Sequence, residues 1–151
     1  MSSNDGANVF TPKNPNFEAT VRETFARQGT MLGIGAEVVA VGPGVCRIRL
    51  PFSERVTQQH GYFHGGLIAT IADTAGGCAA MTLCPPGVEV LTVEYKVNFI
   101  APAKGDEIVA LGYVVRAGRT LTVCRIDVDA VTAGSAPIAC AVMQQTIFNL
   151  S

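Results

Sequence analysis

The sequence predicts an α+β protein in which an antiparallel sheet of about six strands wraps around one long central helix. The first observation is the segment of residues 65–83, which is apolar or small on nearly every side. A helix of that kind must be enclosed on most sides, so we expect the sheet to curl around it. The second observation is that six other segments have the character of strands. The links between the last four are short and contain Gly or Pro, which favours antiparallel neighbours, because a parallel crossover needs about a dozen residues.

The chain begins with a polar, proline-bearing segment that has no apolar period. We expect residues 1–16 to form a flexible N-terminal arm and residues 17–151 to form a single domain. Apolar residues then recur at helical spacing, which predicts a short amphipathic helix that begins at Phe17 and ends at Gly29.

The predicted strands are short segments with two-residue alternation or branched apolar residues, bounded by turn residues. They cover residues 34–41, 45–50, 92–99, 107–116, 121–131 and 138–148. The third of them is the clearest, because apolar and polar side chains alternate along it and should point to opposite faces. The two predicted faces are Val93, Tyr95, Val97 and Phe99 on one side and Thr92, Glu94, Lys96 and Asn98 on the other.

Composition limits the classes of partner. With 48% hydrophobic and 15% charged residues, the chain is apolar for a single domain, so we expect a homodimer or a dimer of dimers that hides further surface. The net charge of −1 gives no broad attraction for nucleic acid or an anionic membrane.

The five cysteines lack paired spacing, which favours reduced core thiols and no metal site. The sequence has no signal-like start and no long apolar run, and we expect a cytoplasmic protein.

The central helix carries one charged residue, Asp73, where burial is expected. An ionised carboxylate is costly to bury without partners, so Asp73 must be paired, protonated or placed in a cavity where it reacts. Gly76 and Gly77 follow it, and each destabilises a helix by about 0.5 to 1 kcal/mol relative to Ala. Such glycines are tolerated where a ligand or a partner helix approaches the backbone closely. The alternative is an aspartate that only bonds a neighbouring loop, with glycines that serve packing.

Gly65 and Gly66 begin the helix and leave its first backbone N–H groups uncovered by side chains. These groups lack acceptors within the helix and carry partial positive charge, so they can polarise a carbonyl oxygen. Gly65 and Asp73 are eight residues apart, about 12 Å along the helix axis, so one small reacting group cannot touch both. If the two act together, they must come from different subunits across a two-fold axis.

The run Gln58-x-x-Gly61-x-x-His64-Gly65-Gly66 followed by Asp73 resembles the signature of the PaaI-type hotdog acyl-CoA thioesterases. Residues 92–106 resemble the next element of that family. The resemblance implies a hotdog fold paired into dimers and the hydrolysis of an acyl-CoA to free acid and CoA. It implies no cofactor, since coenzyme A arrives as part of the substrate.

The resemblance also implies roles for individual residues. The Gly65 N–H would polarise the thioester carbonyl, and Asp73 of the facing subunit would act as general base or nucleophile. Thr92 matches a position where a hydroxyl holds the attacking water. Gln58 stands where many relatives have Asn, and its amide would hold the carbonyl or the water. His64 would orient the loop or the thioester, or it would only cap the helix.

Four further residues are predicted to bind the substrate. Arg116 and Arg119 flank a predicted hairpin tip, where guanidinium groups suit the phosphates of CoA, and the resemblance points to the same loop. A solvated turn is the alternative. Gly66 adjoins the polarising N–H, and Phe63 is an apolar candidate for contact with the acyl chain that could equally belong to the core. The acyl group, small aromatic or short to medium chain, stays open.

Two other functions are compatible with the same residues. A hotdog hydratase or dehydratase would use His64 and Asp73 as paired acid and base, although the Gly-Gly step after His64 fits a thioesterase better. A non-catalytic acyl-CoA binding protein would not need Asp73. As a regulator it would be expected to carry a DNA-binding segment, and the residues before the first strand hold few bases.

Overall fold

The computed structural model describes residues 9–151. Its helices are α1 (Phe17–Ala26), α2 (Gly29–Ile34) and α3 (Gly65–Met81), with one turn of 3-10 helix, η1 (Glu54–Val56). Its strands are β1 (Glu37–Gly42), β2 (Val45–Pro51), β3 (Glu89–Phe99), β4 (Glu107–Ala117), β5 (Leu121–Val131) and β6 (Ile138–Leu150).

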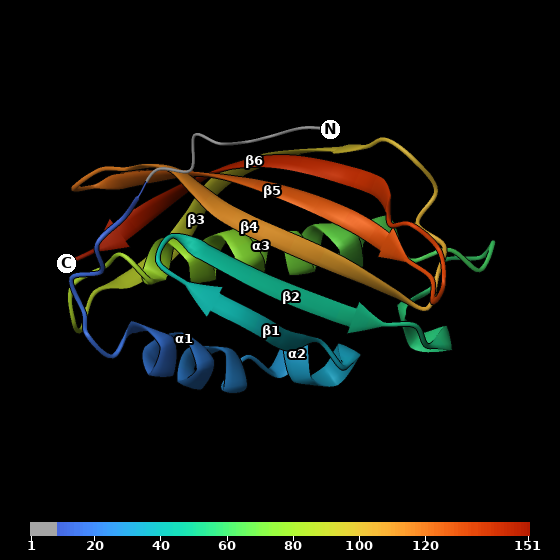
Figure 1. Cartoon of the computed structure of the whole chain (residues 1–151), viewed down its shortest axis with the longest axis horizontal. Coiled ribbons are helices and arrows are strands. Elements are labelled where there is room, and N and C mark those ends of the chain that lie inside the picture. The colour runs from blue at the N-terminus through green and yellow to red at the C-terminus, as the bar shows by residue number, and fades with distance from the viewer. Residues whose placement is uncertain (1–8) are drawn as a thin grey trace.

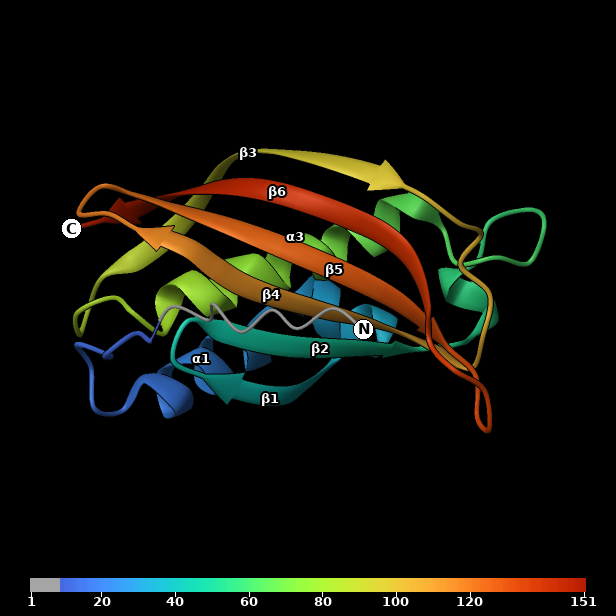
Figure 2. The ribbon, with the colours of Figure 1, turned by 45° about the horizontal axis from the view of Figure 1, so that its top comes forward.

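The strands form one sheet in the order β1-β2-β4-β5-β6-β3, and every neighbouring pair is antiparallel. The sheet curves over α3, which lies along its inner face, while α1 and α2 lie beside β1 (Figures 1 and 2). The predicted α+β class and the predicted sheet of six strands around one helix are therefore confirmed.

Small residues let α3 lie close against the sheet. A side chain at Gly112 of β4 would place its first carbon 2.6 Å from the backbone oxygen of Ala75, so the helix and strand can meet there only at a glycine. Neither α3 nor any other helix among residues 9–151 is both long and apolar enough to cross a membrane.

The core lies between α3 and the inner face of the sheet. Every second residue of the central strands points into it, which is the two-residue period that the sequence shows. The fully buried members with the largest side chains include Ile48, Leu50, Ile71, Ile108, Ile126 and Ile147. Val21 of α1 and Met31 of α2 are also buried, so the two short helices extend this core beyond β1.

The predicted strand over residues 34–41 is wrong at its start. Ile34 ends helix α2, and Gly35 follows in the left-handed conformation at φ 78°. A glycine in that conformation stops a helix, because it lets the next backbone N–H groups bond back to carbonyls of the last turn. Strand β1 begins only at Glu37, and the single predicted helix over 17–29 is replaced by α1 and α2.

The predicted faces of the strand over 92–99 are also corrected. The register between β3 and β6 shifts between Thr92 and Glu94, so Val93 is a bulge residue without a partner of its own. Thr92 lies opposite the buried Ile147 and therefore faces the inside, as Tyr95 does opposite the buried Gln145. Uninterrupted alternation would have placed Thr92 on the outer face.

Half of the predicted N-terminal arm, residues 1–8, lies outside the described residues. In the other half, the ring of Phe10 packs over Gly44 in the turn between β1 and β2, 2.6 Å from where a side-chain carbon would lie. Asn14 is buried and donates a hydrogen bond from Nδ2 to the Thr20 hydroxyl. These contacts attach residues 10–16 to the domain.

All five cysteines are buried and unpaired, which makes the stability of the fold sensitive to alkaline pH. Burial raises the pKa of Cys124 to about 12 and that of Cys140 to about 11. The unfolded chain loses these protons from about pH 8.5 upward, and the folded chain keeps them. Stability from these thiols is thus complete below about pH 8.5 and falls as the pH rises through about 11 to 12.

We therefore expect the urea midpoint of unfolding to fall between about pH 8 and pH 10.5, and to fall less steeply in a Cys124→Ala variant. The comparison of the two pH slopes separates the thiol from lysine and tyrosine titrations, which both proteins share. Equal slopes in the wild type and the variant would contradict the prediction for Cys124.

Candidate active site

Asp73 lies half-buried on α3, and its carboxylate is held by neighbours from two strands. The Thr92 hydroxyl of β3 donates to Asp73 Oδ1 at 2.6 Å. The Gln145 side chain of β6 donates from Nε2 to the same Oδ1 and also to the backbone oxygen of Asp73, the latter at 3.1 Å. The carboxylate that the sequence placed on an apolar helix is thus hydrogen-bonded rather than left without partners.

The start of α3 is fixed by three hydrogen bonds that leave one donor unused. Phe63 N–H donates to the Ala103 oxygen at 3.0 Å, and His64 N–H donates to the Val56 oxygen at 2.8 Å. Gly66 N–H donates to His64 Nδ1 at 2.9 Å, so His64 caps the helix. Because Nδ1 is the acceptor, the neutral imidazole is the tautomer with its hydrogen on Nε2. The Gly65 N–H has no acceptor among residues 9–151, as expected for the first turn of a helix.

An aromatic ring packs against the glycine that carries this unused donor. Phe99, at the end of β3, is about half exposed, and its ring would lie 3.2 Å from a side-chain carbon placed on Gly65. Because Gly65 has no side chain, the Phe99 ring can pack close to the backbone at the helix start. The half-exposed ring gives the surroundings of this N–H an apolar surface, which suits a partly apolar ligand whose oxygen bonds the donor.

The structure separates the predicted residues Gly65 and Asp73. Helix α3 is continuous from Gly65–Met81, so the two residues stay about 12 Å apart along its axis. Thr92, in contrast, is brought to Asp73. Within one chain the predicted site is therefore divided into a helix start that can donate a hydrogen bond and a carboxylate cluster two turns further on.

Gln58 and Phe63 have contacts of their own in the loop before α3. The Gln58 side-chain oxygen accepts a hydrogen bond from His60 N–H, and the NH2 group of that amide has no partner within residues 9–151, so it can bond a ligand. Phe63 is 3% exposed, and its ring meets Phe52 edge-on with centroids 5.7 Å apart. In the single chain Phe63 is a core residue.

The predicted phosphate-binding residues Arg116 and Arg119 lie at the other end of the molecule. Both are exposed on the hairpin that joins β4 to β5, near the C-terminal end of α3 (Figure 1). Arg119 and Lys13 line a groove of about 610 Å³ whose apolar wall includes Leu83 and Val88. The groove offers two cations beside an apolar surface, while Arg116 does not line it.

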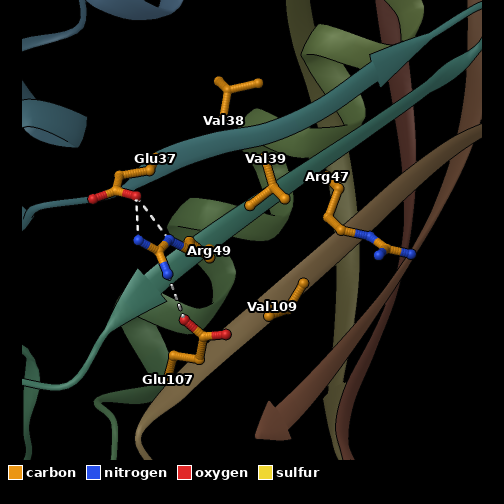
Figure 3. A pocket seen from close by; sticks show the side chains of 7 residues that line it. All are labelled: Glu37, Val38, Val39, Arg47, Arg49, Glu107 and Val109. Atoms are coloured by element: carbon orange, nitrogen blue, oxygen red, sulfur yellow. Dashed lines mark hydrogen bonds and ion pairs between the residues drawn. The ribbon is translucent and has the colours of Figure 1, made fainter.

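A second hollow, of about 380 Å³, lies on the outer face of β1, β2 and β4 (Figure 3). Three of its four charged groups pair with one another: Arg49 bonds Glu37 at 2.7 Å and Glu107 at 3.3 Å, while Arg47 points away from them (Figure 3). The hollow is separated from Asp73 by the sheet. Among residues 9–151, no three His, Cys, Asp or Glu side chains are grouped so that they could hold a metal ion.

Two residues of this region were missed in the sequence. Gln145 is a polar side chain at a buried position of a strand whose other buried positions are apolar, and that mismatch was the available signal. Phe99 was placed in a strand but not next to Gly65, because only the fold brings the end of β3 to the start of α3.

Comparison with known proteins identifies the family. Residues 60–134 match the model of the thioesterase superfamily. A solved thioesterase family protein from Silicibacter pomeroyi is 40% identical and superimposes with a TM-score of 0.86. The alignment covers 89% of this chain and 98% of that protein. The chain belongs to the thioesterase superfamily. It is a thioester hydrolase, as the resemblance implied.

Two more relatives define the neighbourhood of this thioesterase. Acyl-coenzyme A thioesterase 13 of mouse is 30% identical over 98 residues, which are 64% of this chain and 69% of that protein. The PaaI protein of E. coli, from the phenylacetic acid degradation operon, shares the fold with a TM-score of 0.79 at 16% identity, over 92% of this chain and 96% of PaaI. The predicted PaaI-type hotdog fold is confirmed.

The hydrogen bond from Gly66 N–H to His64 Nδ1 leads to a prediction about stability. Replacing His64 with Ala removes the cap, and we expect the free energy of unfolding to fall by about 1 kcal/mol. His64→Asn keeps a capping acceptor and should recover most of that loss. Chemical denaturation measures both, with His60→Ala as the control because the exposed His60 side chain caps no helix. Equal stability of the His64→Ala variant and the wild type would contradict the capping role.

Proposed function

We propose that this protein hydrolyses the thioester of a small aromatic or short to medium-chain acyl-CoA, releasing the free acid and CoA. The observation that carries the proposal is that one helix presents both a hydrogen-bonded carboxylate, Asp73, and an unused donor at its start, the Gly65 N–H. A thioester has an electrophilic carbonyl carbon and a good leaving group. One donor to the carbonyl oxygen and one carboxylate are therefore enough for its hydrolysis.

The exposed stripe of α3 supports a site shared between two subunits. The partly exposed residues of the helix recur every three or four positions, and Asp73 is the only charged one among them. They are Gly65, Gly66, Leu67, Thr70, Asp73, Thr74, Gly77 and Met81. If a second α3 packs antiparallel on this stripe with the two-fold axis near Thr70, Gly65 of one subunit faces Asp73 of the other.

The edge of the sheet supports the same dimer. Strand β3 is an edge strand of eleven residues, and an edge strand this long leaves backbone donors and acceptors unpaired. It also carries large apolar side chains that are 43% to 59% exposed: Leu91, Val93, Tyr95 and Phe99. A second copy that pairs its own β3 with this edge would cover both the backbone groups and the apolar side chains.

In this arrangement the reaction proceeds in a balanced sequence. The Gly65 N–H donates to the thioester oxygen, and Asp73 of the facing subunit takes a proton from water as the water oxygen bonds to the carbonyl carbon. The C–S bond then breaks, and the sulfur takes the proton from Asp73, so CoA leaves as the thiol. As nucleophile, Asp73 would instead bond to the carbonyl carbon, release the thiolate, and form an anhydride that water hydrolyses.

The remaining predicted residues have compatible roles around this reaction. Thr92 holds Asp73 and keeps an acceptor lone pair for water, and the free NH2 group of Gln58 can bond the substrate. Gly66 leaves room beside the donor. Arg119 lies near the C-terminal end of α3 and provides a cation for CoA phosphates. In an antiparallel dimer this end of one α3 lies beside the start of the other subunit's α3. Arg116 extends the positive charge of that hairpin.

The proposal predicts the effect of a single substitution. Asp73→Asn keeps the shape of the side chain but removes its basicity, so we expect kcat to fall by about 10²-fold or more. Thiol release from a panel of aroyl- and acyl-CoA esters measures this, after subtraction of the signal from the protein's own cysteines. If the wild type binds CoA esters without turnover, the protein is a binding module. If it hydrates enoyl-CoA without thiol release, it is a hydratase.

The shared site predicts complementation between two inactive variants. Gly65→Pro deletes the N–H. Proline is favoured at the first helical position, and the residue before it, His64, already has the extended backbone that precedes prolines, with φ −65° and ψ 129°. When Gly65→Pro and Asp73→Asn subunits are mixed by unfolding and refolding, half of the dimers should be mixed and each should hold one intact site. We expect about one quarter of wild-type activity.

Gly65→Ala is the matched control, because it adds the same first side-chain carbon near Phe99 and keeps the N–H. It should retain much more activity than Gly65→Pro. Native mass measurement establishes that the variants still form dimers. If mixing restores no activity while mixed dimers form, the donor and the carboxylate do not act across the subunit boundary.

A further inference from the structure

Gln145 is a buried amide whose place the reaction described above does not explain. It is 0% exposed, on an inner-face position of β6 between the buried Met143 and Ile147. A side-chain amide in such surroundings is costly unless its polar atoms are hydrogen-bonded. Its contacts should therefore show what it does.

The NH2 group of Gln145 points at Asp73 and Thr92. Nε2 lies 3.1 Å from the Asp73 backbone oxygen and 3.0 Å from the Thr92 hydroxyl oxygen, and it also bonds Asp73 Oδ1. A backbone carbonyl can only accept, so the atom that faces it must be the donor nitrogen. The orientation of the amide is therefore fixed by its surroundings.

The other end of the amide lies against Gly76. Oε1 is buried without a hydrogen-bond partner among residues 9–151, and a side-chain carbon at Gly76 would overlap it. The backbone of α3 can pass this oxygen only at a glycine. A buried acceptor without a partner lowers stability. Gln145 has this unfavourable oxygen at one end of its amide and the Nε2 hydrogen bonds to Asp73 at the other.

These contacts distinguish the two oxygens of the Asp73 carboxylate. Oδ1 accepts from both the Thr92 hydroxyl and the Gln145 amide, whereas no residue of 9–151 donates to Oδ2. An oxygen that already accepts from two donors is poorly placed to take up a proton or to attack carbon. Oδ2 is therefore the oxygen that is left for chemistry.

We propose that Gln145 is a positioning residue that, with Thr92, holds Asp73 through Oδ1 and directs Oδ2 to the substrate. Gly76 is part of the same device, because it makes the room in which the Gln145 amide lies. The inference rests on the proposed function, since it assigns the reacting oxygen of the carboxylate that this function uses. It explains why a glycine follows three residues after the aspartate in a buried helix.

The first test replaces the amide while keeping its volume. In Gln145→Met the amide donor to Oδ1 is lost, and we expect kcat to fall by about 10- to 100-fold while KM changes by less than about threefold, because an orienting contact acts on the reacting geometry. A purely structural role would instead lower thermal stability and leave kcat per folded dimer unchanged.

The second test uses Gly76, which touches no substrate in the proposed reaction. Gly76→Ala should displace the amide and lower kcat by at least about tenfold, whereas Gly33→Ala, a helical glycine with open space around it, should not. In a Gln145→Ala background the obstructing oxygen is gone, and the other close atom, Ile126 Cδ1 at 2.9 Å, is the end of a flexible side chain that can shift. Adding Gly76→Ala there should change kcat by less than about twofold, because the two substitutions act through one contact.

The outcomes separate the two proposals. If the wild type hydrolyses no acyl-CoA, the proposed function fails and this assignment fails with it. If the wild type is active but folded Gln145→Met keeps its kcat, or if Gly76→Ala costs the same kcat with and without Gln145, only the positioning role is overturned. Circular dichroism and native mass identify variants that do not fold, and Gln145→Met keeps the test informative if Gln145→Ala is one of them.

Discussion

A carboxylate on an otherwise apolar helix is the constraint on which much of this structure depends. Asp73 needs donors, and the two side chains that donate to its carboxylate come from the sheet. Thr92 reaches it because β3 has a bulge at Val93, and Gln145 reaches it because Gly76 lets the amide pass the helix backbone. Each feature would be a defect in a plain core, and together they stabilise one orientation of the carboxylate.

The same half-buried carboxylate lies on the side of the molecule where we propose that a second copy binds. The exposed stripe of α3 and the apolar edge strand β3 adjoin each other, and Phe99 connects them by lying over Gly65. A surface that is both apolar and provided with edge-strand backbone groups suits the dimer proposed above. The proposed reaction needs that copy for a separate reason, because Gly65 and Asp73 are too far apart within one helix.

Much of the fold could be predicted because its signals are local. The apolar helix beginning at Gly65, the strand over 121–131 and the short links near it follow from periodicity and turn residues. The errors lie where one residue changes the local geometry. Gly35 ends a helix before the predicted strand, and the bulge at Val93 reverses which face Thr92 occupies. A bulge has no strong sequence pattern, because it is set by how a strand fits its neighbour.

The sequence by itself determined the class of the fold, the position of Asp73 and Gly65 on one helix, and the distance that forbids both from touching one group. These depend on composition, period and helix rise, which are properties of a single segment. Only the tertiary structure decided that Thr92 and Gln145 meet the carboxylate and that Oδ2 is left without a donor among residues 9–151. Those contacts join α3, β3 and β6, and the pairing of distant segments depends on the packing of the whole chain.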